Sequence, residues 1–478
     1  MKFFRMMRGL VPILAAVAAT TACAQTTAES QFDPNVVKIP ADKQKFHIFL
    51  LTGQSNMEGA GYPVLPQYLT GTTQVIELTD KMEWVKNVAP YGRGFGPGEA
   101  FALHYAKLHP DVTVGVIHAA RGGRSMRELS KGGRDNTDRA PNYDNLIKKI
   151  KFAQEQGEVK AMLWHQGESD TGNRNYINEL NKLVTDVRTD IGIADLPLFV
   201  GELGRYVNWT DGFNRMIQDV ESKIENCKLI SSKGLMHRGD ELHISGYSVE
   251  IFGCRYLDAY LKMREPATAK KFEPILAEVE KKMAEYDARW ITVENGDMTM
   301  GEDRPLGWEA RRWDPIRINP HRDTKEYASA PASLRIENLD PATALPSVQE
   351  ISTAPGADGI GTWIRDVAGT HVKVSCKVKN EGYSKVTIRI RGENSGFQRC
   401  LDLQLFDATN AKEWTSFSGE FDIPAQAIRD RIGIMVEGKG KAWLDDVVIE
   451  KVKNGKTIHD TKIDVDYEKK MNESFSKL

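Results

Sequence analysis

The sequence predicts two domains: a three-layer α/β/α domain built on a parallel sheet, then an antiparallel β-sandwich. Two observations lead to this fold class. From about residue 45 to residue 264, short apolar runs alternate with amphipathic, helix-like segments, which is typical of a parallel sheet covered on both faces. After about residue 290, short segments with alternating polar and apolar residues are separated by turn residues, which is typical of a sandwich. With 478 residues and 41% hydrophobic residues, the chain is long enough for two full cores.

Residues 25–264 form the predicted α/β domain. Helical periods occur in "YDNLIKKIKFAQEQ" and "YINELNKLVTDVRTDI", which separate some of the apolar runs. The predicted strands of the sheet are "FHIFLL", "VTVGVIHAA", "VKAMLWH", "LPLFVGEL" and "CKLISS".

Residues 265–289 are charged, free of glycine and helical in period, so they predict a connecting helix. Residues 290–453 contain the alternating segments of the predicted sandwich, for example "HVKVSCKVKN", "KVTIRIRG" and "RIGIMVEG". Residues 454–478 are polar and rich in lysine, which predicts a loosely held tail.

Residues 1–24 predict an export signal, because basic residues precede an apolar stretch too short to span a bilayer. Ala22 and Ala24 form an A-x-A cleavage site, and Cys23 between them is a candidate for a lipid anchor. The expected location is therefore periplasmic, extracellular or lipid-anchored to a bacterial envelope. A net charge of -2 gives no general attraction to nucleic acid. The other cysteines are too sparse for a disulfide scaffold, lack metal-ligand spacing and are expected to be buried apolar residues: Cys227, Cys254, Cys376 and Cys400.

Polar clusters follow three of the predicted strands. "GQSN" follows the first, "ARGGRS" follows "VTVGVIH", and "HQGESD" follows "VKAMLW". A fourth cluster, "GDELHIS", lies just before the last helix of the domain. Because ligands of open parallel sheets bind beyond the carboxyl ends of the strands, we expect all four clusters to meet at one edge.

These clusters hold the parts of a serine esterase. Ser55 supplies a nucleophile, His243 a general base and Asp240 a carboxylate that fixes the tautomer of the imidazole. The backbone N–H of Ser55, the backbone N–H of Gly122 and the side-chain amide of Gln166 are candidate oxyanion donors. Each residue taken alone has a structural alternative, such as a helix cap, a surface turn, a tight bend or a group that satisfies buried backbone.

The four motifs also resemble a known family. "GQSNM", "AARGGRSM", "WHQGESD" and "DELH" are similar, in order and spacing over about 220 residues, to the SGNH-type hydrolases of flavodoxin-like fold. Within these, they resemble the sialate O-acetylesterase-like domain shared with carbohydrate esterase family 6. The resemblance implies deacetylation of sugar hydroxyls, with Ser55 as nucleophile, His243 as base, Asp240 as its orienter, and Gly122 and Gln166 in the oxyanion hole. It implies no cofactor and no metal. Glu58 in "GQSNMEG" and the arginines of "ARGGRS" depart from the family pattern and leave the substrate open.

The segment from Arg121 to Arg139 holds five arginines and one lysine against three acidic residues. A positive field beside the oxyanion loop would favour a glycan that carries carboxylates, and a solvated loop is the alternative. We therefore take Arg121 and Arg124 as candidate substrate-binding residues, and Arg127 as an alternative contact for an acidic sugar.

The "HQGESD" motif adds Glu168 to the candidate substrate-binding residues, although a brace for its own loop is the alternative role. His165, Glu168 and Asp170 do not predict a metal site. His118 is expected to be a packing or loop-stabilising residue.

The predicted sandwich resembles, through "ENGDMTM", "PLGW", "SLRI" and "KAWLDDVVIEKV", the jelly-roll carbohydrate-binding-module-like domains fused to polysaccharide-degrading enzymes. At most two of its tryptophans are expected to be exposed for sugar stacking. These are Trp290, Trp308, Trp313, Trp363, Trp414 and Trp443. The sequence thus predicts an exported esterase acting on an acetylated polysaccharide or oligosaccharide, with xylan as the leading substrate. A sialate O-acetylesterase and a non-catalytic glycan-binding protein are the alternatives.

Overall fold

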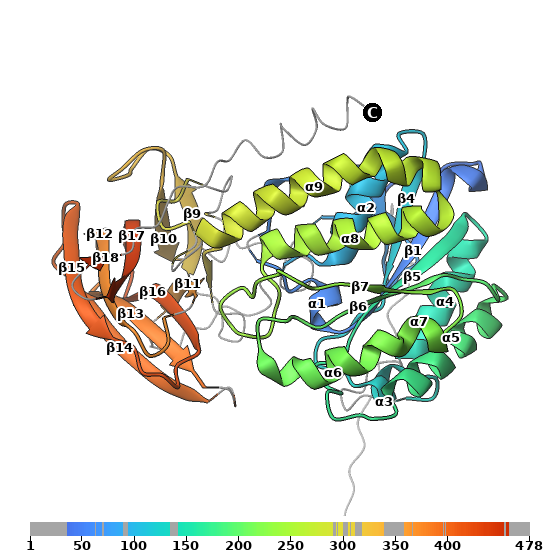
Figure 1. Ribbon diagram of the computed structural model, residues 1–478. Helices are drawn as coiled ribbons and strands as arrows, with labels where there is room; N and C mark the ends of the chain where they lie inside the picture. Colours follow the sequence, from blue (N-terminus) through green and yellow to red (C-terminus); the bar gives the residue numbers. More distant parts are fainter. Residues whose placement is uncertain are drawn as a thin grey trace, which may run out of the picture.

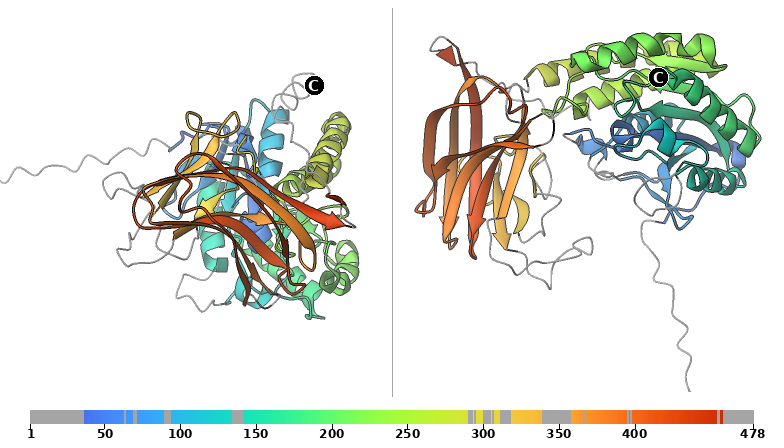
Figure 2. Two further views of the ribbon diagram at one scale, coloured as in Figure 1. Left: turned by 90° about the vertical axis from the view of Figure 1, so that its left-hand side faces the viewer. Right: turned by 90° about the horizontal axis from the view of Figure 1, so that it is seen from below.

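A computed structural model gives the fold of residues 36–457 as two domains, an α/β domain and a β-sandwich at one end of it (Figures 1 and 2). The following residues in this range lie outside the described structure: 63, 69–70, 89–93, 134–141, 290–292, 294, 300–304, 306, 311–317, 339–357, 366, 395, 397 and 454–455.

The α/β domain contains a seven-stranded sheet in the order β3-β2-β4-β1-β5-β6-β7. Its strands are β1 (Phe46–Gly53), β2 (Val75–Leu78), β3 (Trp84–Lys86), β4 (Thr113–His118), β5 (Glu158–His165), β6 (Leu198–Gly201) and β7 (Cys227–Ile230). All neighbouring pairs are parallel except β2 and β3. In β1 the side chains alternate between two cores, with Phe49 and Leu51 in one and Ile48 and Leu50 in the other. A sheet buried on both faces explains why "FHIFLL" is apolar throughout.

Helices cover both faces of this sheet. Helices α2 (Pro97–Leu108), α8 (Gly246–Arg264) and α9 (Pro266–Arg289) contribute to one core, while α4 (Asn142–Gln154), α5 (Tyr176–Ile191) and α7 (Val220–Lys223) contribute to the other. The remaining helical segments of the domain are η1 (Lys43–Lys45), α1 (Ser55–Glu58), η2 (Pro66–Tyr68), α3 (Met126–Leu129), η3 (Asn208–Thr210), α6 (Asp211–Met216) and η4 (Ile217–Asp219). The predicted three-layer α/β fold is confirmed.

Two features of this domain differ from the sequence-based expectation. The sheet continues beyond the predicted strands through β2 and the antiparallel β3, which have only four and three residues and so too few positions to show a pattern. The helix expected as a connector is present as α9, but it is not a free linker. Phe272, Val279 and Met283 on α9 are fully buried in the core formed with α2 and α8.

The second domain is an antiparallel β-sandwich, as predicted. One sheet has the order β15-β12-β17-β10-β9, with β18 paired to β17, and the other has the order β14-β13-β16-β11-β8. The strands are β8 (Glu309–Ala310), β9 (Ile318–Asp323), β10 (Ser333–Asn338), β11 (Asp358–Ile364), β12 (His371–Glu381), β13 (Lys385–Glu393), β14 (Arg399–Asp407), β15 (Thr415–Asp422), β16 (Arg429–Glu437), β17 (Lys441–Lys453) and β18 (Lys456–Thr457). Burial alternates along β12, where Val372, Val374 and Val378 face the shared core.

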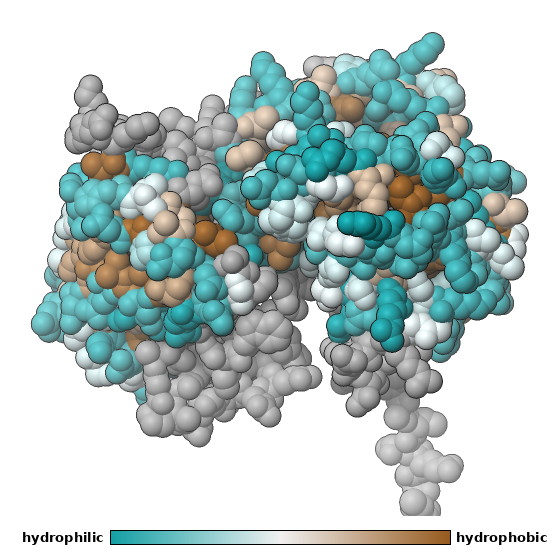
Figure 3. Space-filling model, turned by 60° about the horizontal axis from the view of Figure 1, so that its bottom comes forward, coloured by the Kyte–Doolittle hydropathy of each residue, from teal (hydrophilic) through white to brown (hydrophobic). Residues whose placement is uncertain are grey.

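Several predictions fall outside the described residues, namely the export signal, Cys23, Trp290, Trp313 and the tail from residue 458 onward. Among the described helices, none combines the length and apolar character needed to cross a membrane. The four cysteines within the described residues are free thiols, and all but Cys400 are buried. Hydrophilic residues cover most of the face shown in Figure 3, and apolar side chains gather there only in small groups.

Candidate active site

Ser55 lies at the carboxyl end of the central strand β1, as the first residue of the short helix α1. Gly53 makes this abrupt turn possible. Its φ of +126° is rarely adopted by residues with a side chain, and a Cβ there would lie 2.0 Å from the carbonyl oxygen of His165. The strand thus ends in close contact with β5, and the Ser55 side chain emerges at the edge of the sheet.

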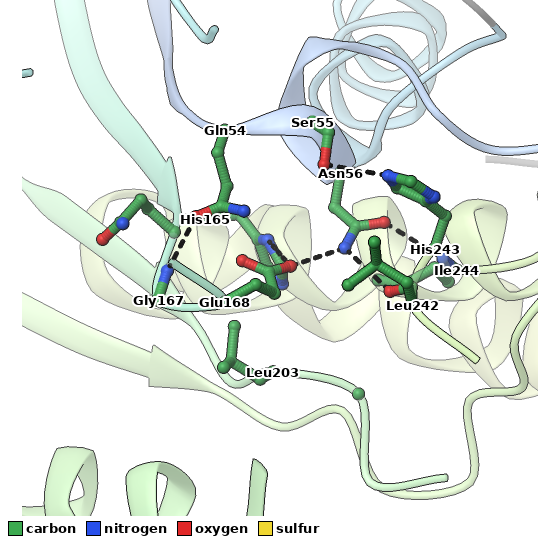
Figure 4. Close-up of polar contacts among 12 residues, drawn as sticks. Gln54, Ser55, Asn56, His165, Gly167, Glu168, Leu203, Leu242, His243 and Ile244 are labelled. Atoms are coloured by element: carbon green, nitrogen blue, oxygen red, sulfur yellow. Dashed lines mark hydrogen bonds and ion pairs between the residues drawn. The ribbon is translucent and has the colours of Figure 1, made fainter. Parts of the chain in front are cut away.

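His243 and Asp240 approach Ser55 from the loop between β7 and α8. Figure 4 shows the ring of His243 beside Ser55. The Oγ of Ser55 lies 3.0 Å from Nε2 of His243, and Nδ1 of the same ring lies 2.7 Å from Oδ2 of Asp240. The other carboxylate oxygen of Asp240 accepts hydrogen bonds from the backbone N–H groups of Leu242 and His243. The carboxylate therefore fixes both the imidazole and the backbone that carries it.

Arg238 completes this group from two residues upstream of Asp240. Its Nε donates to Oδ2 of Asp240 at 2.9 Å, and one terminal nitrogen lies 3.2 Å from Nδ1 of His243. Burial opposes ionisation of Asp240, but Arg238 and His243 outweigh it and hold the pKa of this carboxyl well below its usual range. Burial lowers the pKa of His243, Asp240 partly restores it, and Arg238 lowers it further. The resulting site holds an ionised carboxylate beside an imidazole that favours its neutral form.

Two residues beside Ser55 tie its loop to the neighbouring loops. Asn56 accepts from the backbone N–H of Ile244 at 3.0 Å and donates to Glu168 at 2.6 Å. Gln54 is buried, and its Oε1 accepts from the backbone N–H groups of Gly167 and Ser169. Figure 4 shows Gln54 beside Gly167, and Asn56 between Glu168 and Ile244. Glu168 thus occupies the position of a brace, with its side chain only 6% exposed.

The three oxyanion-donor candidates are in different situations. The N–H of Ser55 is the first of α1 and has no partner within that helix. The N–H of Gly122 lies beside the nucleophile but donates to Oε2 of Glu58 at 2.9 Å. The amide of Gln166 donates to the carbonyl of Arg124 and to Asp170. The oxyanion role of Gln166 remains a prediction. In the structure its amide hydrogens point to Arg124 and Asp170 and not toward Ser55.

The basic loop after β4 is close to the site. The backbone N–H of Arg121 donates to the carbonyl of Gly53 at 3.0 Å, which fixes the loop beside Ser55. The side chain of Arg124 lies 3.5 Å from Glu128, one helical turn away, and Arg127 is exposed. Their contacts with a substrate remain predictions.

The other polar residues of these motifs have structural partners. Nε2 of His165 lies 3.1 Å from the carbonyl oxygen of Glu202. Asp170 accepts from the backbone N–H of Met126 at 2.7 Å. His118 pairs with the buried Glu99 at 2.6 Å, in the packing role expected for it.

Two residues of the site were not identified from the sequence. Gln54 and Arg238 are adjacent to motif residues, and their polar character at buried positions would have been the only signal. Trp209, in a neighbouring loop, was not predicted either, because no local pattern distinguishes an exposed tryptophan from a core one. It is 43% exposed in η3, in the loop that follows β6. Tyr206 anchors this loop by donating to the carbonyl of Leu242, the residue before His243.

A serine at the carboxyl end of a parallel sheet, hydrogen-bonded to a His–Asp pair, is the arrangement of serine hydrolases built on α/β folds. Comparison with known families agrees with this class. Residues 45–262 match the family model described as carbohydrate esterase, sialic acid-specific acetylesterase. The α/β domain is thus similar to this family of carbohydrate esterases, and the chain is a carboxylic ester hydrolase.

Individual relatives cover different parts of the chain. A probable carbohydrate esterase of Arabidopsis thaliana is 26% identical over 242 residues, which cover 45% of this chain and 90% of that protein. An X-ray structure of an Arabidopsis thaliana protein is similar with a TM-score of 0.41 and 25% identity, over 45% of this chain and 98% of that one. A carbohydrate acetylesterase from Xanthomonas citri is similar over 84% of this chain and 74% of its own, with a TM-score of 0.34 and 14% identity. The C-terminal domain resembles a xylan-binding domain from Paenibacillus barcinonensis, with a TM-score of 0.23 and 14% identity, over 32% of this chain and 90% of that one.

Proposed function

We propose that this chain is an exported serine esterase that removes O-acetyl groups from plant polysaccharide, with acetylated xylan as the leading substrate. The observation that carries the proposal is the continuous hydrogen-bonded series from Ser55 Oγ through His243 to Asp240, with distances of 3.0 and 2.7 Å.

In the proposed mechanism, Ser55 attacks the acetyl carbonyl while Nε2 of His243 accepts the hydroxyl proton. Asp240 holds the Nδ1–H and stabilises the imidazolium that forms. Backbone N–H groups of Ser55 and Gly122 stabilise the oxyanion, each by about 3 kcal/mol. His243 then returns the proton to the departing sugar oxygen, which leaves an acetyl-enzyme. Water attacks this ester with His243 again as base, which releases acetate and regenerates Ser55.

The C-terminal domain supports a polymeric substrate, since its sequence motifs resemble those of carbohydrate-binding modules in polysaccharide-degrading enzymes. A sialate O-acetylesterase would use the same three residues and is the second candidate, favoured by the description of the matching family. A non-catalytic glycan-binding protein would not need the bonded Ser55–His243–Asp240 series.

The substrate is tested by measuring acetate release from acetylated xylan, xyloglucan, pectin and mannan and from O-acetylated sialic acid, with 4-nitrophenyl acetate as a general ester. The proposal expects turnover of 4-nitrophenyl acetate and fastest acetate release from xylan. Preference for the sialic acid would favour the second candidate. Absence of turnover with every ester, from folded protein, would favour the binding protein.

The pH dependence of kcat/KM follows from the pKa of His243. The neutral imidazole accepts the serine proton, so activity is lost as the pH falls through that pKa. Because the pKa is lowered from the ordinary value of 6.5, we expect the acid limb of the profile to lie below pH 6.5. A profile of kcat/KM against pH for 4-nitrophenyl acetate measures this limb, and a limb above the ordinary imidazole pKa would contradict the expectation.

Glu58 is expected to slow the reaction, because its carboxylate occupies the N–H of Gly122 and places negative charge beside the developing oxyanion. Replacing Glu58 with Ala should raise kcat/KM for 4-nitrophenyl acetate by up to about tenfold, which corresponds to about 1.4 kcal/mol. The Glu58→Gln variant keeps the size of the side chain without its charge, and its kcat/KM should lie between those of wild type and Glu58→Ala. A fall in both variants would show that Glu58 instead positions the Gly122 loop.

Trp209 offers an exposed aromatic face in the loop tied to Leu242, and we expect it to stack against the sugar. The Trp209→Ala change should raise KM for acetylated xylan about fivefold, the equivalent of about 1 kcal/mol of lost contact, and leave 4-nitrophenyl acetate unaffected. Trp209→Phe keeps an aromatic face and should retain most of the affinity. Equal KM values for the polymer in wild type and Trp209→Ala would exclude this contact.

A further inference from the structure

The loop that carries Asp240 and His243, residues 237–243, is held in an unfavourable backbone conformation. Gly239 has a φ of +112° and Glu241 a φ of +53°, the left-handed region that non-glycine residues avoid. Besides the contacts of Asp240 and Arg238 described above, His237 accepts from the backbone N–H groups of Gly239 and Glu241, and the N–H of Arg238 donates to the carbonyl of His243. A strained loop of this kind persists only when its surroundings hold it.

Part of that support comes from the β-sandwich. Nε of Arg429, on β16, donates to the backbone carbonyl of Asp240 at 3.0 Å, across 189 positions of sequence. The guanidinium of Arg429 is itself fixed by the carbonyl of Asn394 at 2.5 Å. Arg365, which follows β11, donates to the carbonyl of His237 at 3.0 Å. Two arginines of the second domain thus bind the backbone of the loop at its start and in its middle.

Trp363 on β11 adds a second kind of contact. The guanidinium of Arg238 lies 5.5 Å from the centre of its ring, and that of Arg431 lies 4.0 Å from it. Gly239 approaches the same strand so closely that a Cβ on it would lie 2.9 Å from the carbonyl oxygen of Ile364. Because Arg238 donates to Asp240, the Trp363 ring supports the residue that holds the catalytic carboxylate.

We propose that the β-sandwich contributes to the geometry of the esterase site. Trp363 and Arg429 are positioning residues that keep His243 within hydrogen-bonding distance of Ser55. Neither residue is needed to touch the substrate. They act through the backbone and the arginine that fix Asp240. Their loss therefore lets the imidazole move, while the nucleophile loop stays in place through Gln54 and the Asn56–Glu168 bond. The expected loss of kcat rests on the proposed function. The expected weakening of the His243–Asp240 hydrogen bond does not depend on it.

The test compares full-length Trp363→Ala and Arg429→Met with wild type on 4-nitrophenyl acetate, an ester too small to need a glycan-binding surface. We expect kcat to fall about 10- to 100-fold in each variant, the cost of a displacement of about 1 Å, while KM changes less than about twofold. The conservative variants Trp363→Phe and Arg429→Lys should recover much of kcat. Arg389→Met, on β13 of the same sheet and paired on the surface with Asp402, is the matched control and should behave as wild type.

A second readout does not depend on turnover. The proton shared between Nδ1 of His243 and Asp240 should give a low-field NMR resonance that is absent from His243→Ala. We expect this resonance to weaken or vanish in Trp363→Ala and Arg429→Met and to persist in Arg389→Met. If wild type shows the resonance but hydrolyses no ester, the proposed function fails while the positioning role is still tested by the variants. Unchanged kcat and an unchanged resonance in both variants would overturn the proposal.

Discussion

Replacing Ser55 with alanine is expected to lower kcat/KM for acetyl esters by about 10⁴- to 10⁶-fold, the loss seen when a nucleophile that works with a general base is removed. The hydroxyl 3.0 Å from His243 is the group that would carry the acetyl intermediate. The residual rate would come from binding and oxyanion donors alone. Hydrolysis of 4-nitrophenyl acetate and acetate release from xylan measure the loss.

Two further variants sharpen this experiment. His243→Ala should lower kcat/KM about as much as Ser55→Ala does. The double variant should lower it little further, because the effects of residues that act as one unit do not add. Ser222→Ala, an exposed serine of α7, should leave the rate unchanged. A Ser55→Ala enzyme that keeps more than about a tenth of the activity would contradict the assignment of the nucleophile.

Arg365→Met is expected to destabilise the protein by about 3–5 kcal/mol, because it leaves the carboxylate of Asp287 buried without its cation. The side chains of Arg365 and Asp287 are only 1% and 2% exposed, and Nη1 lies 3.1 Å from Oδ1. The guanidinium also donates to the backbone carbonyls of Asp287 and His237. Thermal and urea unfolding, each followed by two probes because two domains need not unfold together, measure the change.

The matched comparison for this pair is a surface pair in the sandwich. Arg389→Met breaks its contact with Asp402, which is about a third exposed, and should cost at most about 1 kcal/mol. The double variant Arg365→Met with Asp287→Asn should recover part of the loss, since the uncompensated charge is then gone. Equal stability of Arg365→Met and Arg389→Met would show that the buried Arg365–Asp287 pair does not stabilise the contact between the two domains.

The sequence predicted the fold class and the meeting of the polar clusters because both depend on short-range patterns. Buried parallel strands leave continuous apolar runs, and their carboxyl ends meet at one edge whatever lies between them. Ser55 and His243, 188 residues apart, could therefore be placed together from strand ends alone. Their catalytic roles remain predictions until the variants are measured.

The remaining features depend on three-dimensional contacts that carry no local pattern. The hydrogen bond from Gly122 to Glu58 requires two loops to approach at one particular distance. The contacts of Trp363 and Arg429 with the loop of Asp240 join two domains whose sequence patterns are independent. Tryptophan in a strand is usually a core residue, so nothing in the sequence around Trp363 distinguished a contact between domains from ordinary packing.

The burial of α9 in the α/β core changes where the first domain can be cut. The family match ends at residue 262, yet Phe272, Val279 and Met283 cover apolar surface of α2 and α8. An excised fragment that stopped at the family boundary would expose that surface to water and tend to aggregate. Modular engineering of this enzyme should therefore keep the helix through Arg289 as part of the esterase unit.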